Sequence, residues 1–265
     1  MVFETLTNNK FFLTFMKYRY LLYELVKKTV KLDYRRSFLG IFWIFLEPIL
    51  YTIVVSAVFS TLLGRGIENF PVYLLCGKLA FVFFSGGTTA AMNSIVKTSI
   101  IKRVYVPKYI YPLATVIGKY FTFLISLIVL FGLAIGSSVP LTWHVFTVII
   151  PFILLFFLTL GVGLTLSTII IFIRDVKQLW NVFTSLLMWC SAVFYDANMV
   201  PEHYRFILDY NPIFHIIDMI RKSILFGQSY DPNQVFFVLG VTIFFLVLGI
   251  LLLFKYQDKF ILYMQ

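Results

Sequence analysis

The sequence predicts an all-α membrane protein with six transmembrane helices, an N-terminal amphipathic interfacial helix and re-entrant helices between spans 5 and 6. Two observations predict this class. Apolar residues make up 60% of the 265 residues and charged residues only 13%, whereas a water-facing domain carries about a quarter charged residues. The apolar residues also form long runs without inside–outside alternation, which favours helices over the strands of a membrane barrel.

Six apolar segments have the length of a membrane crossing. Each is near or above the ~17–25 residues that cross a ~30 Å hydrocarbon core at about 1.5 Å per residue. We place the spans within a transmembrane domain of residues 39–265, at about 39–63, 71–96, 109–137, 145–173, 179–195 and 234–254. The two halves show no internal repeat, so the inverted-repeat architecture of many secondary transporters is not supported.

The distribution of basic residues predicts the orientation. Of the 22 Lys and Arg, 16 lie before span 1, in the loops after spans 2 and 4, or in the tail, and only four lie on the opposite side. Cytoplasmic loops carry such an excess, so we expect a multi-pass membrane protein with both termini in the cytoplasm. The net charge of +10 then reports topology and contact with membrane lipid, and predicts no nucleic-acid partner.

Residues 1–38 form a basic cytoplasmic leader. At 100° per residue its charged side chains fall on one stripe and its apolar side chains on the rest of the wheel. This pattern predicts an amphipathic helix in the cytoplasmic interface; a solvated leader without a special role is the alternative. The candidate interfacial basic residues are Lys28, Lys31, Arg35 and Arg36.

The stretch between spans 5 and 6 contains a further apolar run at 213–226. It is too short to span the membrane, which favours a re-entrant or interfacial segment. Asn211 and Pro212 predict a helix start before it, and Gly227 predicts a helix end after it. We expect re-entrant helices at about 203–228, near the mouth of a pathway.

Motifs for phosphate cradling, hydrolysis and metal binding are absent from the sequence. It contains no GxxxxGK[ST], HExxH or GxSxG pattern, its twelve acids are dispersed, and Cys76 and Cys190 stand in apolar stretches. Hydrolytic or phosphate-transfer chemistry needs clustered groups. We expect no catalytic residue, no metal and no cofactor on this chain.

Three ionisable residues lie inside predicted spans, at Glu47, Lys78 and Lys119. Such groups are costly in lipid and are candidates for function. The alternatives without a functional role are that Lys78 extends its amino group to the membrane surface and that Lys119 has a partner on another helix. Glu47 shares one face of its helix with Trp43 and Tyr51, so this face is expected to meet a pathway or a neighbouring helix.

Four segments, in order along the chain, carry a family resemblance. Residues 32–50, LDYRRSFLGIFWIFLEPIL, resemble the opening of type-2 ABC transporter permeases that export polysaccharides, O antigens and teichoic acids. The segments 100–108 (IIKRVYVPK), 171–177 (IFIRDVK) and 210–221 (YNPIFHIIDMIR) are similar to three further elements of these permeases. The matches in the first segment are Tyr34, Arg35, Arg36, Ser37, Leu39, Gly40, Trp43 and Pro48. One departure is Glu47, where the family more often has Asn before the proline.

The resemblance implies a permease subunit of an ATP-driven exporter that moves a lipid-linked polysaccharide. It implies a homodimer joined to two copies of a separate ABC ATPase subunit, which binds the ATP and Mg. It also implies that the loop 97–108 couples to that ATPase, and that the chain lies in a bacterial-type cytoplasmic (inner) membrane. The candidate coupling residues are Ile101, Lys102, Arg103, Val104, Tyr105 and Pro107.

Aromatic side chains suit a glycan path because sugar C–H faces pack on aromatic rings. Lipid-belt or core packing is the alternative for each. The candidate pathway residues are Trp43, Glu47, Tyr51, Trp189, Phe194 and Tyr195. Two rival functions stay open: a drug- or lipid-exporting ABC permease, and an ion-coupled secondary transporter that uses Glu47 and the intramembrane lysines.

Overall fold

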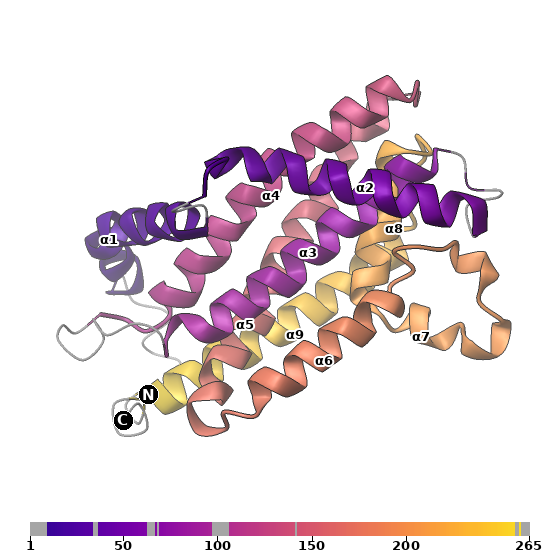
Figure 1. Ribbon diagram of the computed structural model, residues 1–265. Helices are drawn as coiled ribbons and strands as arrows, with labels where there is room; N and C mark the ends of the chain where they lie inside the picture. The colour runs from indigo at the N-terminus through magenta and orange to yellow at the C-terminus, as the bar shows by residue number, and fades with distance from the viewer. Residues whose placement is uncertain are drawn as a thin grey trace.

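The computed structural model describes residues 10–33, 37–62, 67, 69–96, 106–140, 142–257 and 260, and this part of the chain is helical with connecting turns. The predicted all-α fold is confirmed (Figure 1). The longer helices are α1 (Lys10–Asp33), α2 (Trp43–Leu62), α3 (Phe70–Ser94), α4 (Ile110–Gly136), α5 (Ile149–Phe172), α6 (Val176–Trp189), α8 (Pro212–Ile224) and α9 (Pro232–Tyr256). The short elements are α7 (Phe206–Asp209), η1 (Gly40–Phe42), η3 (Trp143–Val148), η4 (Ala197–Met199) and η5 (Glu202–Tyr204).

Five helices of the described chain are long and apolar enough to cross a membrane. They are Gly40–Phe59, Phe70–Ser94, Ile110–Gly136, Trp143–Phe172 and Pro232–Tyr256. They coincide with the first, second, third, fourth and sixth predicted spans, and α6 occupies the place of the fifth.

The helix α6 differs from the predicted span 179–195 at both ends. It has 14 residues, which is about 21 Å at 1.5 Å per residue and less than a ~30 Å core. It ends at Trp189 and a turn follows, in which Ala192 adopts a left-handed φ of 48°. A left-handed residue stops a helix, so the apolar run extends beyond the helix that it forms.

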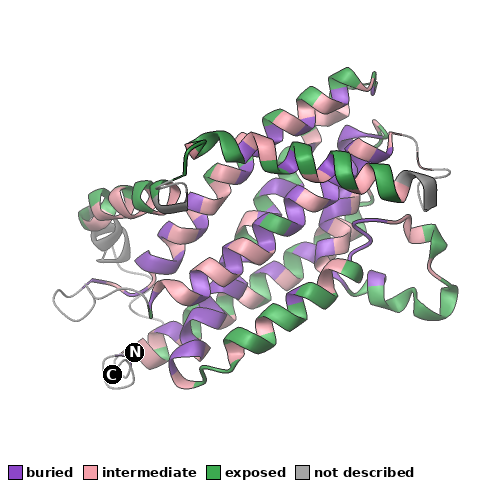
Figure 2. Cartoon of the chain, viewed as in Figure 1, coloured by how far each residue is buried: buried purple, intermediate pink, exposed green. Residues whose placement is uncertain are grey.

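The core lies around α3 and α5. Of the most apolar stretch of α3, 72% of residues are buried, against 17% in α2 and in α9, and Figure 2 shows this contrast between the central and outer helices. The α5–α9 contact depends on small residues, because a Cβ added at Gly161 would lie 2.7 Å from the backbone nitrogen of Leu246. Glycines permit such close approach of membrane helices.

The segments that the charge distribution assigns to the cytoplasm gather at one end of the bundle. The end of α3, the start of α4, the α5–α6 junction and the end of α9 lie there together (Figure 1). The helix α1 packs on α4 near this end, and a Cβ added at Gly118 would lie 2.9 Å from Thr29. The predicted leader helix therefore forms, and its last turns are held against the bundle by α4.

The helix α8 turns back against the bundle at the opposite end (Figure 1). It packs on α3, α5 and α9, and Ile216 and Ile217 are fully buried. The predicted start signal is confirmed, since the Asn211 side chain accepts hydrogen bonds from the backbone N–H groups of Ile213 and Phe214. Gly227 follows the helix with a left-handed φ of 58°.

Candidate functional site

Two adjoining cavities lie along α3. In Figure 1, α2 and α6 run on either side of α3. The first cavity, of about 190 Å³, lies between α2, α3 and α4. The second, of about 690 Å³, lies between α1, α3, α4 and α6. Gly86 and Lys119 line both, so the two cavities are neighbours, and we call them together the α3 groove.

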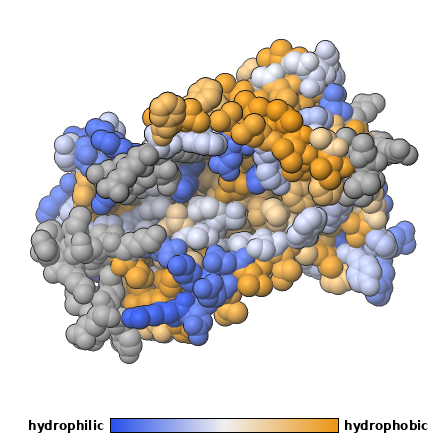
Figure 3. Space-filling model, viewed as in Figure 1, coloured by the Kyte–Doolittle hydropathy of each residue, from blue (hydrophilic) through white to orange (hydrophobic). Residues whose placement is uncertain are grey.

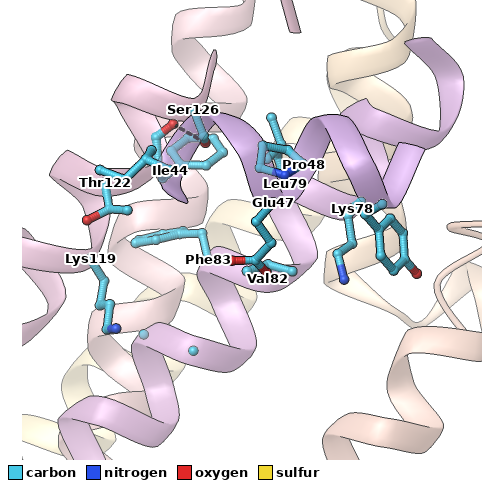
Figure 4. Close-up of a pocket in the computed structure, with 14 residues that line it drawn as sticks. Ile44, Glu47, Pro48, Lys78, Leu79, Val82, Phe83, Lys119, Thr122 and Ser126 are labelled. Atoms are coloured by element: carbon cyan, nitrogen blue, oxygen red, sulfur yellow. Dashed lines mark hydrogen bonds between the residues drawn. The ribbon is translucent and has the colours of Figure 1, made fainter. Parts of the chain in front are cut away.

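The first cavity brings together the three ionisable residues predicted inside spans. Glu47 comes from α2, Lys78 from α3 and Lys119 from α4, and all three line it. In Figure 4 the Glu47 carboxylate and the two amino ends extend toward the same side of α2. The sequence singled out each of the three residues because it lies within an apolar span. The structure shows that all three line the same cavity.

Tyr51 joins this group from α2. The Lys78 ammonium nitrogen lies 3.7 Å from the centre of the Tyr51 ring, a cation–π distance at which the negative face of the ring attracts the cation. Tyr51 also lines the cavity. Trp43, one helical turn before Glu47, is 38% exposed and lines neither cavity.

The second cavity is lined by hydroxyl and amide groups. On α3, Ser85, Thr89 and Asn93 recur every four residues and therefore share one helix face. Figure 3 shows a pale strip of less hydrophobic surface between two orange surfaces, over the middle of the molecule. The other polar lining residues are Lys28, Thr29, Ser94, Tyr111, Thr115, Lys119 and Thr184.

Most of these hydroxyls donate within their own helix. Thr115 Oγ1, for example, donates to the Tyr111 carbonyl at 2.8 Å, which leaves the oxygen lone pairs as acceptors. Tyr111 is different: its ring is 3% exposed and its hydroxyl has no hydrogen-bond partner among the described residues. Sequence reasoning missed this polar face, although its spacing of four residues was a readable signal.

Three of the predicted pathway aromatics form one cluster after α6. The Trp189 and Phe194 ring centres are 5.0 Å apart, and Phe59 of α2 stacks on Phe194 at 5.9 Å. The Tyr195 hydroxyl donates to the Trp189 carbonyl at 2.6 Å. Phe194 is 4% exposed, so it packs the cluster, whereas Trp189 is 52% exposed and presents a free ring face.

Arg221 of α8 holds this junction in place. It donates to the Tyr73 hydroxyl (2.9 Å), the Tyr73 carbonyl (3.3 Å), the Ala192 carbonyl (2.9 Å) and the Val193 carbonyl (3.0 Å). Its guanidinium carbon lies 3.5 Å from the centre of the Tyr73 ring. The sequence placed Arg221 on the outer side and at the end of the family element 210–221, but it did not show that the side chain is 3% exposed and joins three segments.

Asn211 adds a second tie to the same junction. Besides capping α8, its Nδ2 donates to the Cys190 carbonyl and to Ser191 Oγ, both at 2.9 Å. Together with Arg221 it fixes the turn that follows α6. This explains why the helix ends at Trp189.

The predicted basic and coupling residues are only partly described. Lys28 lines the second cavity, and Lys31 is exposed on α1. Pro107 is half-buried, and its carbonyl accepts from the Ile110 backbone N–H at 3.2 Å. The following predicted residues lie outside the described part: Arg35, Arg36, Ile101, Lys102, Arg103, Val104 and Tyr105. Within the described ranges, no group of three His, Cys, Asp or Glu could hold a metal ion.

Residues 20–225 match the family described as ABC-2 type transporter. The match covers most of the chain, and the chain belongs to this family. It is 28% identical over 241 residues to the O-antigen export system permease protein RfbA of Klebsiella pneumoniae, covering 89% of this chain and 93% of the relative. It is 29% identical over 189 residues to the protein of the same name from Myxococcus xanthus, covering 70% and 72%.

A more distant similarity extends to a polysialic acid transport protein. The chain is 21% identical over 230 residues to the polysialic acid transport protein KpsM of Escherichia coli, covering 81% of this chain and 84% of the relative. The family resemblance inferred from the four sequence segments is therefore confirmed. The apolar helices agree with the multi-pass membrane protein that this family implies.

Proposed function

We propose that the chain is the membrane-spanning permease subunit of an ATP-driven ABC exporter that moves a lipid-linked polysaccharide across the cytoplasmic membrane. O-antigen and capsular polymers are the favoured substrates, because the relatives are named for O-antigen export, polysialic acid transport and capsule polysaccharide export. A polymer of teichoic acid type is the further candidate. The observation that carries the proposal is family membership over residues 20–225 together with the polar α3 groove.

The groove has the chemistry that a glycan requires. Its Ser, Thr and Asn side chains offer acceptors and donors to sugar hydroxyls, and the aromatic cluster at Trp189 offers ring faces to sugar C–H groups. A path with both properties lets a polar chain pass a lipid-filled layer without stripping its hydrogen bonds. Trp43, Glu47, Tyr51, Trp189, Phe194 and Tyr195 stay proposed pathway residues, of which Glu47 and Tyr51 line the groove.

A second copy of the chain completes the proposed pathway. The outer faces of α2 and α6 expose large apolar side chains, among them Ile53 (60%) on α2 and Leu186 (61%) on α6. In a homodimer, α2 and α6 of both copies surround a common path, and their separation opens it. Faces of this kind meet lipid or another apolar surface, which supports the dimer.

Coupling to ATP is proposed to occur at the basic end. The family implies an ABC ATPase partner, and we propose two copies of it, which bind the ATP and Mg. The loop 97–108 joins α3 to α4, the two helices that carry Lys78 and Lys119, so a motion of this loop reaches the groove directly. We propose that the leader helix α1 and the residues Ile101, Lys102, Arg103, Val104, Tyr105 and Pro107 face the ATPase.

A deletion strain tests the proposed function. Loss of the chain should abolish surface glycan, and the wild-type chain should restore it together with a copurifying ATPase whose ATP-binding lysine is essential. Export that persists without an ATPase and follows an ion gradient would contradict the proposal in favour of a secondary transporter. Normal surface glycan with broad drug sensitivity would favour a drug or lipid exporter instead.

A further inference from the structure

We propose that Lys78 is a positioning residue with two alternative partners on α2, Tyr51 and Glu47, and that its transfer from one to the other accompanies a slide of α2 along α3 by about one helical turn. The inference rests on the proposed function, in which the separation of α2 and α6 opens the path. It adds to that movement the side-chain contacts that hold α2 at each of two positions.

The spacing of the two partners is the first support. Glu47 and Tyr51 are four residues apart on α2 and therefore share one helix face. Four residues correspond to about 6 Å along the helix at 1.5 Å per residue. Packed elements move past one another in discrete steps of about one turn, or about 5.4 Å, because intermediate positions pack poorly. One such step would replace Tyr51 with Glu47 beside Lys78.

The present contacts of Lys78 are the second support. Its ammonium nitrogen lies 3.7 Å from the centre of the Tyr51 ring, and the Glu47 carboxylate acts on it electrostatically. Within the described part of the chain, no hydrogen bond or ion pair connects Glu47 to Lys78. A desolvated cation–π contact and a buried ion pair both give only a modest net gain, so neither partner holds the lysine permanently.

The structure has room for the transfer. Glu47, Tyr51 and Lys78 all line the first cavity, of about 190 Å³. Gly86 lines it too, and a Cβ added there would meet nothing within 4 Å. Lysine carries its charge on a flexible four-carbon stem. The amino group can therefore pass from the ring to the carboxylate without disturbing the packing of α3.

Two hydroxyls of α2 are a further support that does not involve charge. Thr52 Oγ1 and Ser56 Oγ are buried and have no hydrogen-bond partner among the described residues. By contrast, Thr88 of α3 and Thr159 of α5 donate to carbonyls of their own helices at 2.8 and 2.7 Å. Buried polar groups are nearly always paired, so α2 in its present position leaves bonds unmade that another position can supply. Only 17% of its most apolar stretch is buried, so little packing opposes a slide.

Distances between two spin labels test the inference in the full chain, assembled with its ATPase partner in lipid nanodiscs. In a Cys190→Ser background, one label is placed at Ile53 on α2 and the other at Val96 after the end of α3, both exposed positions. Labelled subunits are diluted with unlabelled ones, so that distances within one chain are measured. A slide of α2 toward the end of the bundle that carries α8 should lengthen this distance by about 5 Å.

The two partners should shift the equilibrium in opposite directions. Each variant is measured without nucleotide and during ATP turnover. Tyr51→Leu removes the ring and should raise the ratio of the long to the short distance about tenfold without nucleotide. Glu47→Gln removes the carboxylate and should lower this ratio about tenfold during turnover. Tyr51→Phe keeps the ring face and should stay within about threefold of the wild-type ratio.

A third substitution separates the proposed transfer from a general loosening of α2. In a Lys78→Met background, neither Tyr51→Leu nor Glu47→Gln should change the ratio, because no cation is left to move between the partners. Size-exclusion profiles confirm that each variant assembles. If Glu47→Gln does not assemble, Glu47→Asn takes its place.

Two results would overturn the inference. One is a single, unchanged distance in the wild-type chain and in Tyr51→Leu, both without nucleotide and during turnover. The other is an effect of Tyr51→Leu that is equally large in the Lys78→Met background. Surface glycan is measured in the same strains: normal export together with either result removes the slide and leaves the proposed function standing. The expected distances in a wild-type chain that exports no glycan would contradict the proposed function alone.

Discussion

Lys78 and Tyr51 form a cation–π contact between α3 and α2, with the ammonium nitrogen 3.7 Å from the ring centre. The contact joins a deeply packed helix to one whose most apolar stretch is mostly exposed. It therefore stabilises α2 at the wall of the groove. It also keeps the Lys78 amino group within the groove, beside Glu47.

Replacing Tyr51 with Leu should weaken the attachment of α2. Removal of the ring loses a desolvated cation–π contact worth about 2 kcal/mol, and a lower midpoint of thermal unfolding in detergent would report the loss. Tyr51→Phe keeps the ring face and should change the midpoint little. Equal midpoints for Tyr51→Leu and Tyr51→Phe would show that the ring does not carry the contact.

Replacing Arg221 with Met should be among the most damaging single changes in the chain. It leaves the Ala192 and Val193 carbonyls and the Tyr73 hydroxyl without the donors seen in the structure, at a cost of about 3 kcal/mol or more. The yield of monodisperse protein after solubilisation measures this. Arg205→Met removes an exposed arginine from the same outer region and should preserve the yield; a comparable loss in both variants would refute the special role of Arg221.

The hydrogen bonds of Asn211 to the turn after α6 can be separated from its role as the N-terminal cap of α8. Asn211→Ala removes the cap of α8 and the bonds to Cys190 and Ser191, whereas Asp231→Ala removes only a cap at the start of α9. Loss of a cap costs about 1 kcal/mol, and each further bond adds about 1 kcal/mol. Thermal unfolding should therefore rank Asn211→Ala as clearly less stable; the reverse order would contradict the tie to the turn after α6.

The close approach of α5 and α9 predicts a sharp difference between two glycines. At Gly161 an added methyl would lie 2.7 Å from the Leu246 backbone nitrogen, while at Gly240 it would meet nothing within 4 Å. Overpacking of this kind costs about 1–3 kcal/mol, so Gly161→Ala should lower the unfolding midpoint. Gly240→Ala should be neutral or slightly stabilising, and an equal response at the two positions would contradict the packing.

The predicted orientation is testable by labelling single cysteines. In a Cys190→Ser background, Glu202→Cys should react with a membrane-impermeant maleimide in intact spheroplasts, because Glu202 is exposed at the end opposite the basic loops. Lys177→Cys, exposed after α5, should react only after permeabilisation. The opposite labelling pattern would contradict the orientation that the distribution of Lys and Arg predicts.

The sequence showed which charged residues lie deep within membrane spans, but it did not show which of them lie close together in the fold. Glu47, Lys78 and Lys119 each stood out because a charge in an apolar run is costly, but their meeting depends on how α2, α3 and α4 cross, which periodicity does not contain. The α3 hydroxyl face escaped notice because Ser and Thr bond to their own helix and hardly disturb an apolar run.

The outer end was the least predictable region. The apolar run at 179–195 looked like one span, and it could not show that Ala192 takes a left-handed conformation or that Arg221 and Asn211 bind the turn. Arg221 resembled an outer charge because its partners, Tyr73 and the Ala192 and Val193 carbonyls, lie between 28 and 148 residues away in the sequence. Local signals did succeed for α8, whose start at Asn211–Pro212 depends on capping alone.

Photo-crosslinking of the glycan in transit tests the central claim most directly. A photoreactive residue in place of Thr89 lies in the groove, whereas one in place of Phe244, which is 61% exposed on α9, lies on an outer apolar face. During ATP-dependent export, illumination should attach glycan to the chain at position 89 and not at position 244. Adducts at neither position, or equally at both, would contradict a glycan path along α3.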